Sequence, residues 1–173
     1  MPQIQVKSKL EKQVISISLI LVGLFVFLDH VTKYLIVKDS SLVYKPIIVI
    51  PGFFNIVSVR NTGAAFGMFH GNNLILFLIA FIAFVLLCCC FRTVTEGWRE
   101  RYYALGLILS GIIGNAIDRT LRHSVVDFLD FYFGSYHWPS FNVADSAICI
   151  GVCILILSFL LRPAEKTVKK NNE

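Results

Sequence analysis

The chain has 173 residues, of which 56% are hydrophobic and only 16% are charged. So few charges exclude a disordered chain, and they are too few to cover the surface of a soluble globular protein. The mean hydropathy of +0.71 instead favours a small bundle of membrane helices.

Four uncharged stretches mark candidate membrane spans. With the apolar residues that flank them, they predict four transmembrane helices, at about 14–36, 74–92, 102–118 and 143–161. We therefore expect residues 1–173 to form a single all-α membrane domain with outward loops at about 38–73 and 119–142. The first apolar run lacks a small-residue cleavage site, so we interpret it as an uncleaved helix and not as a signal peptide.

The first outward loop is richer in strand-forming residues than a simple linker. Residues 43–59 contain many Ile, Val, Phe and Tyr residues, and Pro51 with Gly52 predicts a turn between them. The pattern predicts two short strands that form a small β platform outside the bilayer. Such a platform could lie on the lipid surface or line a binding groove.

The positions of Lys and Arg indicate the orientation in the membrane, because cytoplasmic segments carry an excess of both. Ten of the sixteen lie in the two tails or in the connection between the second and third helices. These are Lys7, Lys9, Lys12, Arg92, Arg99, Arg101, Arg162, Lys166, Lys169 and Lys170. Both termini should therefore be cytoplasmic, and the net charge of +5 requires no nucleic-acid partner.

The five cysteines give a weak signal. Cys88, Cys89 and Cys90 are consecutive, so their side chains would diverge on a helix and could not share one metal ion. Cys149 and Cys153 lie one helical turn apart in the fourth predicted helix. We interpret all five as small packing residues, and nothing else in the sequence supports palmitoylation of the first three.

Several ionisable residues lie at the ends of predicted spans, where burial is costly and a functional role is the default hypothesis. Asp29 and Lys33 are four residues apart, which places them on one helix face as an ion pair. The alternative is an interfacial salt bridge in which Lys33 extends to the surface. Asp118 and Arg119 close the third helix, either as functional groups or as a helix-end cap with local pairing.

Two further carboxylates indicate a reaction. Asp127 lies in the second outward loop, and Asp145 begins the fourth helix, where an N-terminal cap is the alternative role. The segment between them can fold back and bring both to one membrane face. Two carboxylates in a low-dielectric site share one proton. One can then activate water while the other protonates the substrate, as in aspartic proteases.

Other hydrolytic sites find less support. The sequence has no His-Glu-x-x-His motif for zinc and no Gly-x-Ser-x-Gly nucleophile elbow. A Ser–Lys pair that uses Lys33 is compatible with the spacing, but no serine is distinguished. The histidines are scattered and have no expected ligand partners nearby; they are His30, His70, His123 and His137.

Four blocks of sequence, in order, carry a resemblance. They are DHVTK at 29–33, NTGAAFG at 61–67, GIIGNAIDR at 111–119, and VVDF at 125–128 with PSFNVADS at 139–146. The chain resembles the lipoprotein signal peptidase (signal peptidase II) family, four-helix aspartic proteases of bacterial inner membranes. The resemblance covers about residues 29–151. His30, where the family often has Gln, is a departure outside the catalytic pair.

The resemblance implies roles for individual residues. Asp127 and Asp145 would be the catalytic dyad, and Gly63 with Gly114 would let backbones approach closely. The residues that would bind substrate or support the dyad are Asp29, Lys33, Asn61, Gly63, Asn115, Asp118, Arg119 and Asn142. No metal or other cofactor is implied.

The resemblance also implies a substrate and a location. The substrate would be a prolipoprotein whose cysteine already carries diacylglycerol, cut just before that cysteine to release the signal peptide. The enzyme would be a monomer surrounded by membrane lipids in the bacterial inner membrane, with its active site at the extracytoplasmic face.

Two other classes of function compete with a peptidase. A small proton-coupled transporter would also contain buried acids, but here the ionisable groups gather at one face and none lies in the middle of a span. A structural scaffold would not need several acids at one interface.

Overall fold

The structure is a computed structural model that describes residues 2–63, 69 and 71–162. Its α-helices within that part of the chain are α1 (Pro2–Lys38), α2 (Asn73–Cys89), α3 (Phe91–Thr95), α4 (Arg99–Arg122) and α5 (Val143–Leu161). Three helical segments are long and apolar enough to cross a membrane, namely Lys9–Lys38, Arg99–Arg122 and Val143–Leu161. α2 is apolar but has only 17 residues.

The largest differences between predicted and observed helix ends lie at the start of α1 and the end of α4, and α2 ends at Cys89 and not near residue 92. α1 begins at Pro2 and not near residue 14, because the Lys, Glu and Gln residues before the apolar run are good helix formers. α4 continues past residue 118 to Arg122, which forms an ion pair with Asp118 one turn earlier. His123 then ends the helix with a φ of 56°. Arg119 therefore lies on a helix and not in the predicted loop.

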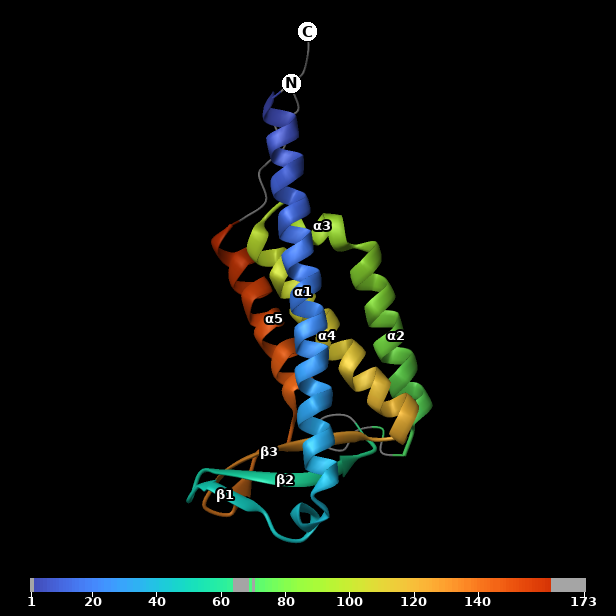
Figure 1. The fold of residues 1–173 in the computed structure, drawn as a ribbon, viewed down its shortest axis with the longest axis vertical. Helices are drawn as coiled ribbons and strands as arrows, with labels where there is room; N and C mark the ends of the chain where they lie inside the picture. The colour runs from blue at the N-terminus through green and yellow to red at the C-terminus, as the bar shows by residue number, and fades with distance from the viewer. Residues whose placement is uncertain (1, 64–68, 70, 163–173) are drawn as a thin grey trace.

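The helices pack around α4, which contacts α1, α2 and α5 (Figure 1). The backbones of α4 and α5 approach closely: a Cβ atom added to Gly151 would lie only 2.6 Å from the carbonyl oxygen of Ala104. Nearer the candidate site, a Cβ atom on Gly114 would lie 3.3 Å from the Ala144 Cβ atom, so the first turn of α5 also packs closely against α4.

Four antiparallel strands form one sheet, in the order β1-β2-β3-β4. They are β1 (Ile47–Ile50), β2 (Phe54–Asn61), β3 (Val125–Phe133) and β4 (Tyr136–His137). β1 and β2 confirm the hairpin predicted within 43–59. β3 and β4 were not predicted, and they show that the first outward loop does not form the sheet alone. Two aspartates interrupt the apolar pattern of β3, which concealed the strand in the sequence.

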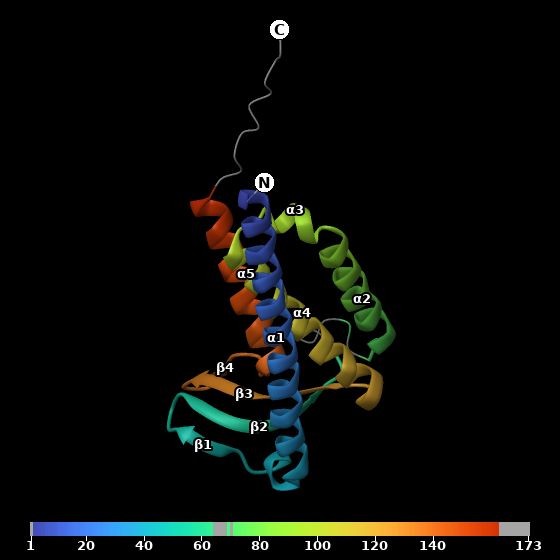
Figure 2. The same ribbon diagram turned by 45° about the horizontal axis from the view of Figure 1, so that its top comes forward.

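The sheet lies across one end of the helix bundle, roughly crosswise to α1 and α5 (Figures 1 and 2). A small core of Ile36, Leu42, Val126 and Phe128 joins the end of α1 to the beginning of β3. Asp127 lies between two of these core residues in the chain. The hydrophobic contact therefore sets the position of a candidate catalytic carboxylate.

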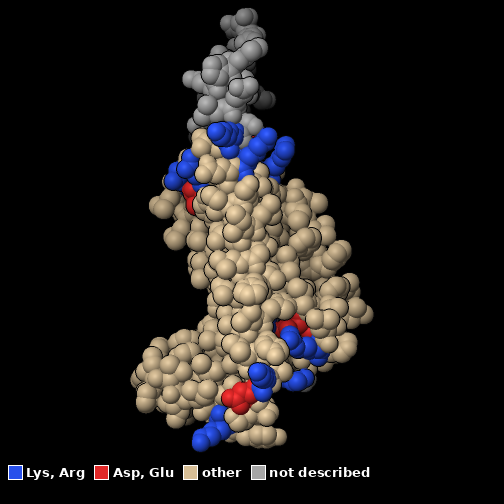
Figure 3. All heavy atoms as spheres, viewed as in Figure 1, with Lys and Arg blue, Asp and Glu red and all other residues tan. Residues whose placement is uncertain are grey.

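Charged side chains gather toward the two ends of the face seen in Figure 3, and the band between them is uncharged. This distribution and the three apolar helices identify a membrane-type helical protein with a small antiparallel sheet. Of the basic residues counted for orientation, Lys166, Lys169 and Lys170 lie outside the described residues, and Arg101 is fully buried.

All five cysteines are free and exposed on the protein surface, so the prediction that they are packing residues is wrong. Cys88, Cys89 and Cys90 lie at the end of α2, while Cys149 and Cys153 lie on α5. In an apolar helix, the sequence pattern does not show which side a neighbouring helix covers.

Candidate active site

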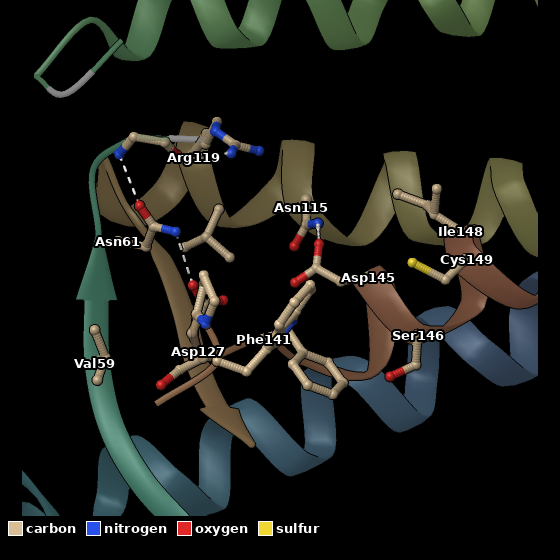
Figure 4. A pocket seen from close by; sticks show the side chains of 15 residues that line it. Val59, Asn61, Asn115, Arg119, Asp127, Phe141, Asp145, Ser146, Ile148 and Cys149 are labelled. Atoms are coloured by element: carbon tan, nitrogen blue, oxygen red, sulfur yellow. Dashed lines mark hydrogen bonds between the residues drawn. The ribbon is translucent and has the colours of Figure 1, made fainter. Parts of the chain in front are cut away.

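A cavity of about 590 Å³ lies where the sheet meets α4 and α5 (Figure 4). Its polar lining comes from separate elements: Asn61 of β2, Asn115 and Arg119 of α4, Asp127 of β3 and Asp145 of α5. The rest of the lining is mainly apolar and includes Val59, Trp138, Pro139, Phe141, Ile148 and Cys149. The cavity thus combines two carboxyl groups with an apolar surface.

Asp127 is almost completely buried at 3% exposure. Its two carboxyl oxygens accept hydrogen bonds from amide groups: Asn61 Nδ2 donates to Oδ2 at 2.9 Å, and Asn142 Nδ2 donates to Oδ1 at 2.8 Å. The pKa of Asp127 is raised to about 6, chiefly by burial and also by the nearby charge of Asp145, against the lowering effect of these donors.

Asp145 occupies the first turn of α5 in a capping box with Asn142. Asn142 Oδ1 accepts from the Asp145 backbone at 3.0 Å, and the Asn142 backbone donates to Asp145 Oδ2 at 3.2 Å. The other carboxyl oxygen accepts from Asn115 Nδ2 at 2.7 Å. The predicted capping role is therefore present together with a position in the cavity lining.

The orientation of each asparagine amide follows from the donor that holds its oxygen. Asn61 Oδ1 accepts from the Gly63 backbone at 2.8 Å, and Asn115 Oδ1 accepts from Lys33 Nζ at 3.0 Å. The Asn142 oxygen is held by the cap of α5. All three amides consequently present their Nδ2 groups to a carboxyl group.

Lys33 is fully buried directly behind these amides. Its Nζ lies 2.7 Å from Asp29 Oδ2 and 3.0 Å from Asp118 Oδ2. The ion pair predicted from the i, i+4 spacing is present, and Lys33 does not extend to the surface. Because a buried cation needs paired anions, these contacts hold α1 and α4 in one arrangement.

The two aspartates bound to Lys33 also hold the backbone on which the catalytic candidates lie. Asp29 Oδ1 accepts from the backbone of Ala144 at 2.9 Å, and Asp118 Oδ2 accepts from that of Val126 at 3.3 Å. Ala144 and Val126 are each adjacent in the chain to a cavity carboxylate. A Cβ atom on Gly114 would lie 2.7 Å from Asp29 Oδ2, so the lack of a side chain there leaves room for the network.

Arg119 reaches the cavity from α4 and donates from Nη2 to the carbonyl oxygen of Gly63 at 3.4 Å. Its Nε is buried and has no hydrogen-bond partner among residues 2–63, 69 and 71–162. The guanidinium therefore retains a donor that a bound molecule could use.

Five polar side chains predicted from the sequence line the cavity, namely Asn61, Asn115, Arg119, Asp127 and Asp145, whereas the lining residues Ser140 and Ser146 were not predicted as site residues. Asn142, Asp29, Lys33 and Asp118 lie behind the cavity. The sequence blocks include residues 139–141, but their place in the apolar wall, that of Trp138, and the contact of His137 with Asp130 were not predicted. The residues of β3 do not alternate between polar and apolar, so the sequence offered no simple signal that Asp127 and Asp130 belong to a strand. Positions 64–67 of the second sequence block lie outside the described residues.

Comparison with known proteins agrees with this arrangement. A family model for signal peptidase (SPase) II matches residues 21–161. The lipoprotein signal peptidase of Maridesulfovibrio salexigens is 43% identical over 137 residues, which cover 76% of this chain and 87% of that protein. The lipoprotein signal peptidase of Bacillus subtilis is 40% identical over 143 residues, 83% of this chain and 92% of that protein.

A solved structure described as a bacterial membrane enzyme has 35% sequence identity and a TM-score of 0.79, and the match covers 90% of this chain and 94% of that one. A second such structure has 36% identity and a TM-score of 0.76. Sequence and fold lead to the same assignment: the chain belongs to the signal peptidase II family of aspartic proteases.

Proposed function

We propose that this peptidase removes the signal peptide from prolipoproteins and that Asp127 and Asp145 together activate the attacking water. Family membership supports the reaction and displaces the transporter hypothesis. One observation carries the residue assignment: both carboxyl groups line the same cavity, and Asn142 contacts both of them.

In the resting pair, Asp127 holds the shared proton and Asp145 is ionised. Burial raises the pKa of Asp127 to about 6, which favours its protonated form. Asp145 lies in the first turn of α5, where the helix N-terminus stabilises an anion. It also accepts a hydrogen bond from Asn115, whose own oxygen is bound to the Lys33 ammonium. Lys33, with Asp29 and Asp118, thereby positions the dyad.

The reaction needs only these groups and water. The Asp145 carboxylate takes a proton from water as its oxygen bonds to the scissile carbonyl carbon, while Asp127 gives its proton to the carbonyl oxygen. In the collapse of this tetrahedral intermediate, the C–N bond breaks and Asp145 returns the proton to the leaving nitrogen. A hydroxyl of the intermediate restores the proton to Asp127, and the enzyme is regenerated.

The rest of the cavity supports a lipid-modified peptide as the substrate. Arg119 has a buried Nε donor without a partner in the described part of the chain, and it would receive a substrate carbonyl. Asn61 and Gly63 form the adjacent edge of the cavity. The apolar lining contributed by Ile148 and other side chains suits the residue that carries the acyl chains.

We further infer the arrangement in the membrane. At about 1.5 Å per residue, the 17 residues of α2 extend roughly 26 Å, close to the bilayer hydrocarbon thickness of about 30 Å, so α2 would be a fourth span. Both termini would be cytoplasmic and the sheet and cavity extracytoplasmic. The chain would act as a monomeric single domain in the inner membrane, because it contains every group the reaction needs.

The proposal is tested with purified protein in liposomes and a diacylglyceryl-modified prolipoprotein, with cleavage followed as a mass shift. Asp127→Asn and Asp145→Asn should each reduce the rate by roughly 10² to 10⁴-fold, the contribution of general acid–base groups. Asp39→Asn is a matched control, because Asp39 is exposed and only caps the short helix η1 (Ser40–Val43). Full cleavage by either dyad variant, with the fold retained, would refute the assignment.

A further inference from the structure

Residues 138–141 form one wall of the cavity and connect two anchored points of the chain. At one end, Asn142 contacts both dyad residues. At the other end, His137 ends β4. Phe141 is held by backbone hydrogen bonds with Leu129. Trp138 is 52% exposed, although its backbone donates to Phe131 at 2.8 Å. Trp138 follows β4 directly in the chain, so the position of this part of the wall is coupled to the position of β4.

A buried carboxylate that the proposed reaction does not use holds the end of β4. Asp130 of β3 is 5% exposed and lies three residues after Asp127. Its Oδ2 accepts from Asn55 Nδ2 of β2 at 3.1 Å, and its Oδ1 lies 2.8 Å from His137 Nδ1. One side chain thus connects three neighbouring strands of the sheet.

The chemistry of this contact determines which atom donates. A carboxylate only accepts hydrogen bonds, so the contact with Asp130 uses the His137 tautomer that carries a proton on Nδ1. The imidazole ring also stacks on Tyr132, with ring centroids 5.0 Å apart and planes 9° from parallel. Because a buried carboxylate without its partner is costly, the pair strongly favours one position of His137.

We propose that Asp130 and His137 are positioning residues for the 138–141 wall of the cavity: the hydrogen bond between them fixes the end of β4 and so holds Trp138 and Pro139 where the peptide beside the scissile bond must pack. The inference rests on the proposed function in one respect, namely that substrate occupies this cavity. It concerns peptide binding and not the chemical step, which Asp127 and Asp145 perform.

Steady-state kinetics distinguishes positioning from a merely structural role. His137→Phe keeps an aromatic ring that can stack on Tyr132 but removes the donor to Asp130. It should raise KM roughly tenfold, the effect of one hydrogen bond to a charged group, with kcat within about twofold. His137→Asn supplies a donor near the original Nδ1 and should restore KM. His123→Asn is the control, since His123 is an exposed histidine outside the cavity lining with a φ of 56° that Asn accepts.

Tryptophan fluorescence tests the wall without substrate. The chain has two tryptophans, and Trp98 begins α4 at the opposite end from the cavity. In a Trp98→Phe background, acrylamide quenching reports Trp138 alone. His137→Phe should increase the quenching constant by roughly twofold as the wall opens locally, and His137→Asn should not. Asp130→Asn should behave like His137→Phe if it folds. If Asp130→Asn does not fold, His137→Phe still provides the test, because His137 is exposed.

The outcomes separate this inference from the proposed function. Unchanged KM and unchanged quenching in His137→Phe would refute the positioning role while leaving the peptidase activity intact. A fall in kcat with no change in KM would also refute it. If the Trp98→Phe protein does not cleave prolipoprotein, the proposed function fails, and the quenching experiment still decides whether the pair holds the wall.

Discussion

A fully buried cation lies beside each end of α4, Arg101 on α4 itself and Lys33 on α1, and within the described residues only the Lys33 network connects to the cavity. At the start of the helix, Arg101 binds Glu96 at 2.5 Å, Ser158 at 2.9 Å and the carbonyl oxygen of Arg162 at 3.0 Å. Near its other end, Lys33 binds two aspartates and Asn115. Arg101 and Lys33 are buried to the same extent, each with 0% of its surface exposed.

The partners of the two cations differ in what lies beyond them. Arg101 contacts α3, the end of α5 and the ring of Phe159. The centroid of that ring lies 4.1 Å from the guanidinium carbon. The Lys33 contacts continue through Asn115 to Asp145 in the cavity. In the described part of this protein, the Lys33 network reaches a cavity that a ligand can occupy, and the contacts of Arg101 do not.

The largest effect is expected from removing each cation. Arg101→Met and Lys33→Met should both lower the free energy of unfolding by about 3–5 kcal/mol, because each leaves buried partners without their counter-charge. Only Lys33→Met should also reduce kcat per folded molecule, by roughly 10²-fold, since the dyad is no longer held in position. Urea unfolding in detergent and single-turnover cleavage measure the two quantities. Equal kcat losses in both variants would contradict the distinction.

Two further substitutions, with smaller expected effects, each remove one neutral hydrogen-bond partner from a buried network. Asn115→Ala removes the donor to Asp145, and Ser158→Ala removes the acceptor of Arg101 Nε. Each lost hydrogen bond to a charged group contributes about 1.5–3 kcal/mol. In Asn115→Ala we expect this loss in the activation free energy, as a kcat reduced roughly 10 to 10²-fold. In Ser158→Ala it should appear only in thermal stability; a matching loss of kcat there would overturn the comparison.

The pH dependence should arise at the cavity end alone. The pKa of Asp127 is raised from 3.8 to about 6, so kcat/KM should fall as pH rises above about 6 and the dyad loses its shared proton. In the same window the folded protein binds more protons than the unfolded chain, so the Asp127 contribution to stability decreases as pH rises from 3.8 to about 6. The Arg101→Met variant should keep the wild-type profile. If kcat/KM does not change across this pH range, the result would contradict a shared proton.

The smallest effect is expected from a chelator. Neither buried network uses a metal in the proposed reaction, and no group of three His, Cys, Asp or Glu residues within 2–63, 69 and 71–162 could hold one. EDTA should therefore leave the cleavage rate within about twofold, in contrast to enzymes whose metal generates the nucleophile. Strong inhibition that Zn²⁺ or Mg²⁺ reverses would require a different mechanism.

The apolar helices and the first hairpin were predictable because local composition encodes them. Scarcity of charge marks the apolar helices, and the run of β-branched and aromatic residues around Pro51 predicts the β1–β2 hairpin. β3 was not recognised because Asp127 and Asp130 interrupt its apolar pattern, although each is buried against a different set of partners. A strand supported by such partners is visible only once the partners are in place.

The chemistry available to this protein was predictable from composition and motifs: four sequence blocks, a membrane-type hydropathy and the carboxylates Asp127 and Asp145 at the edge of predicted spans. Only the folded structure shows which long-range contacts hold these groups in position. Lys33 meets Asn115 across 82 positions, and Asn55 meets Asp130 across 75. No local periodicity encodes such pairs. They exist because packing removes these groups from water, and each must then find its donor, acceptor or counter-charge elsewhere in the fold.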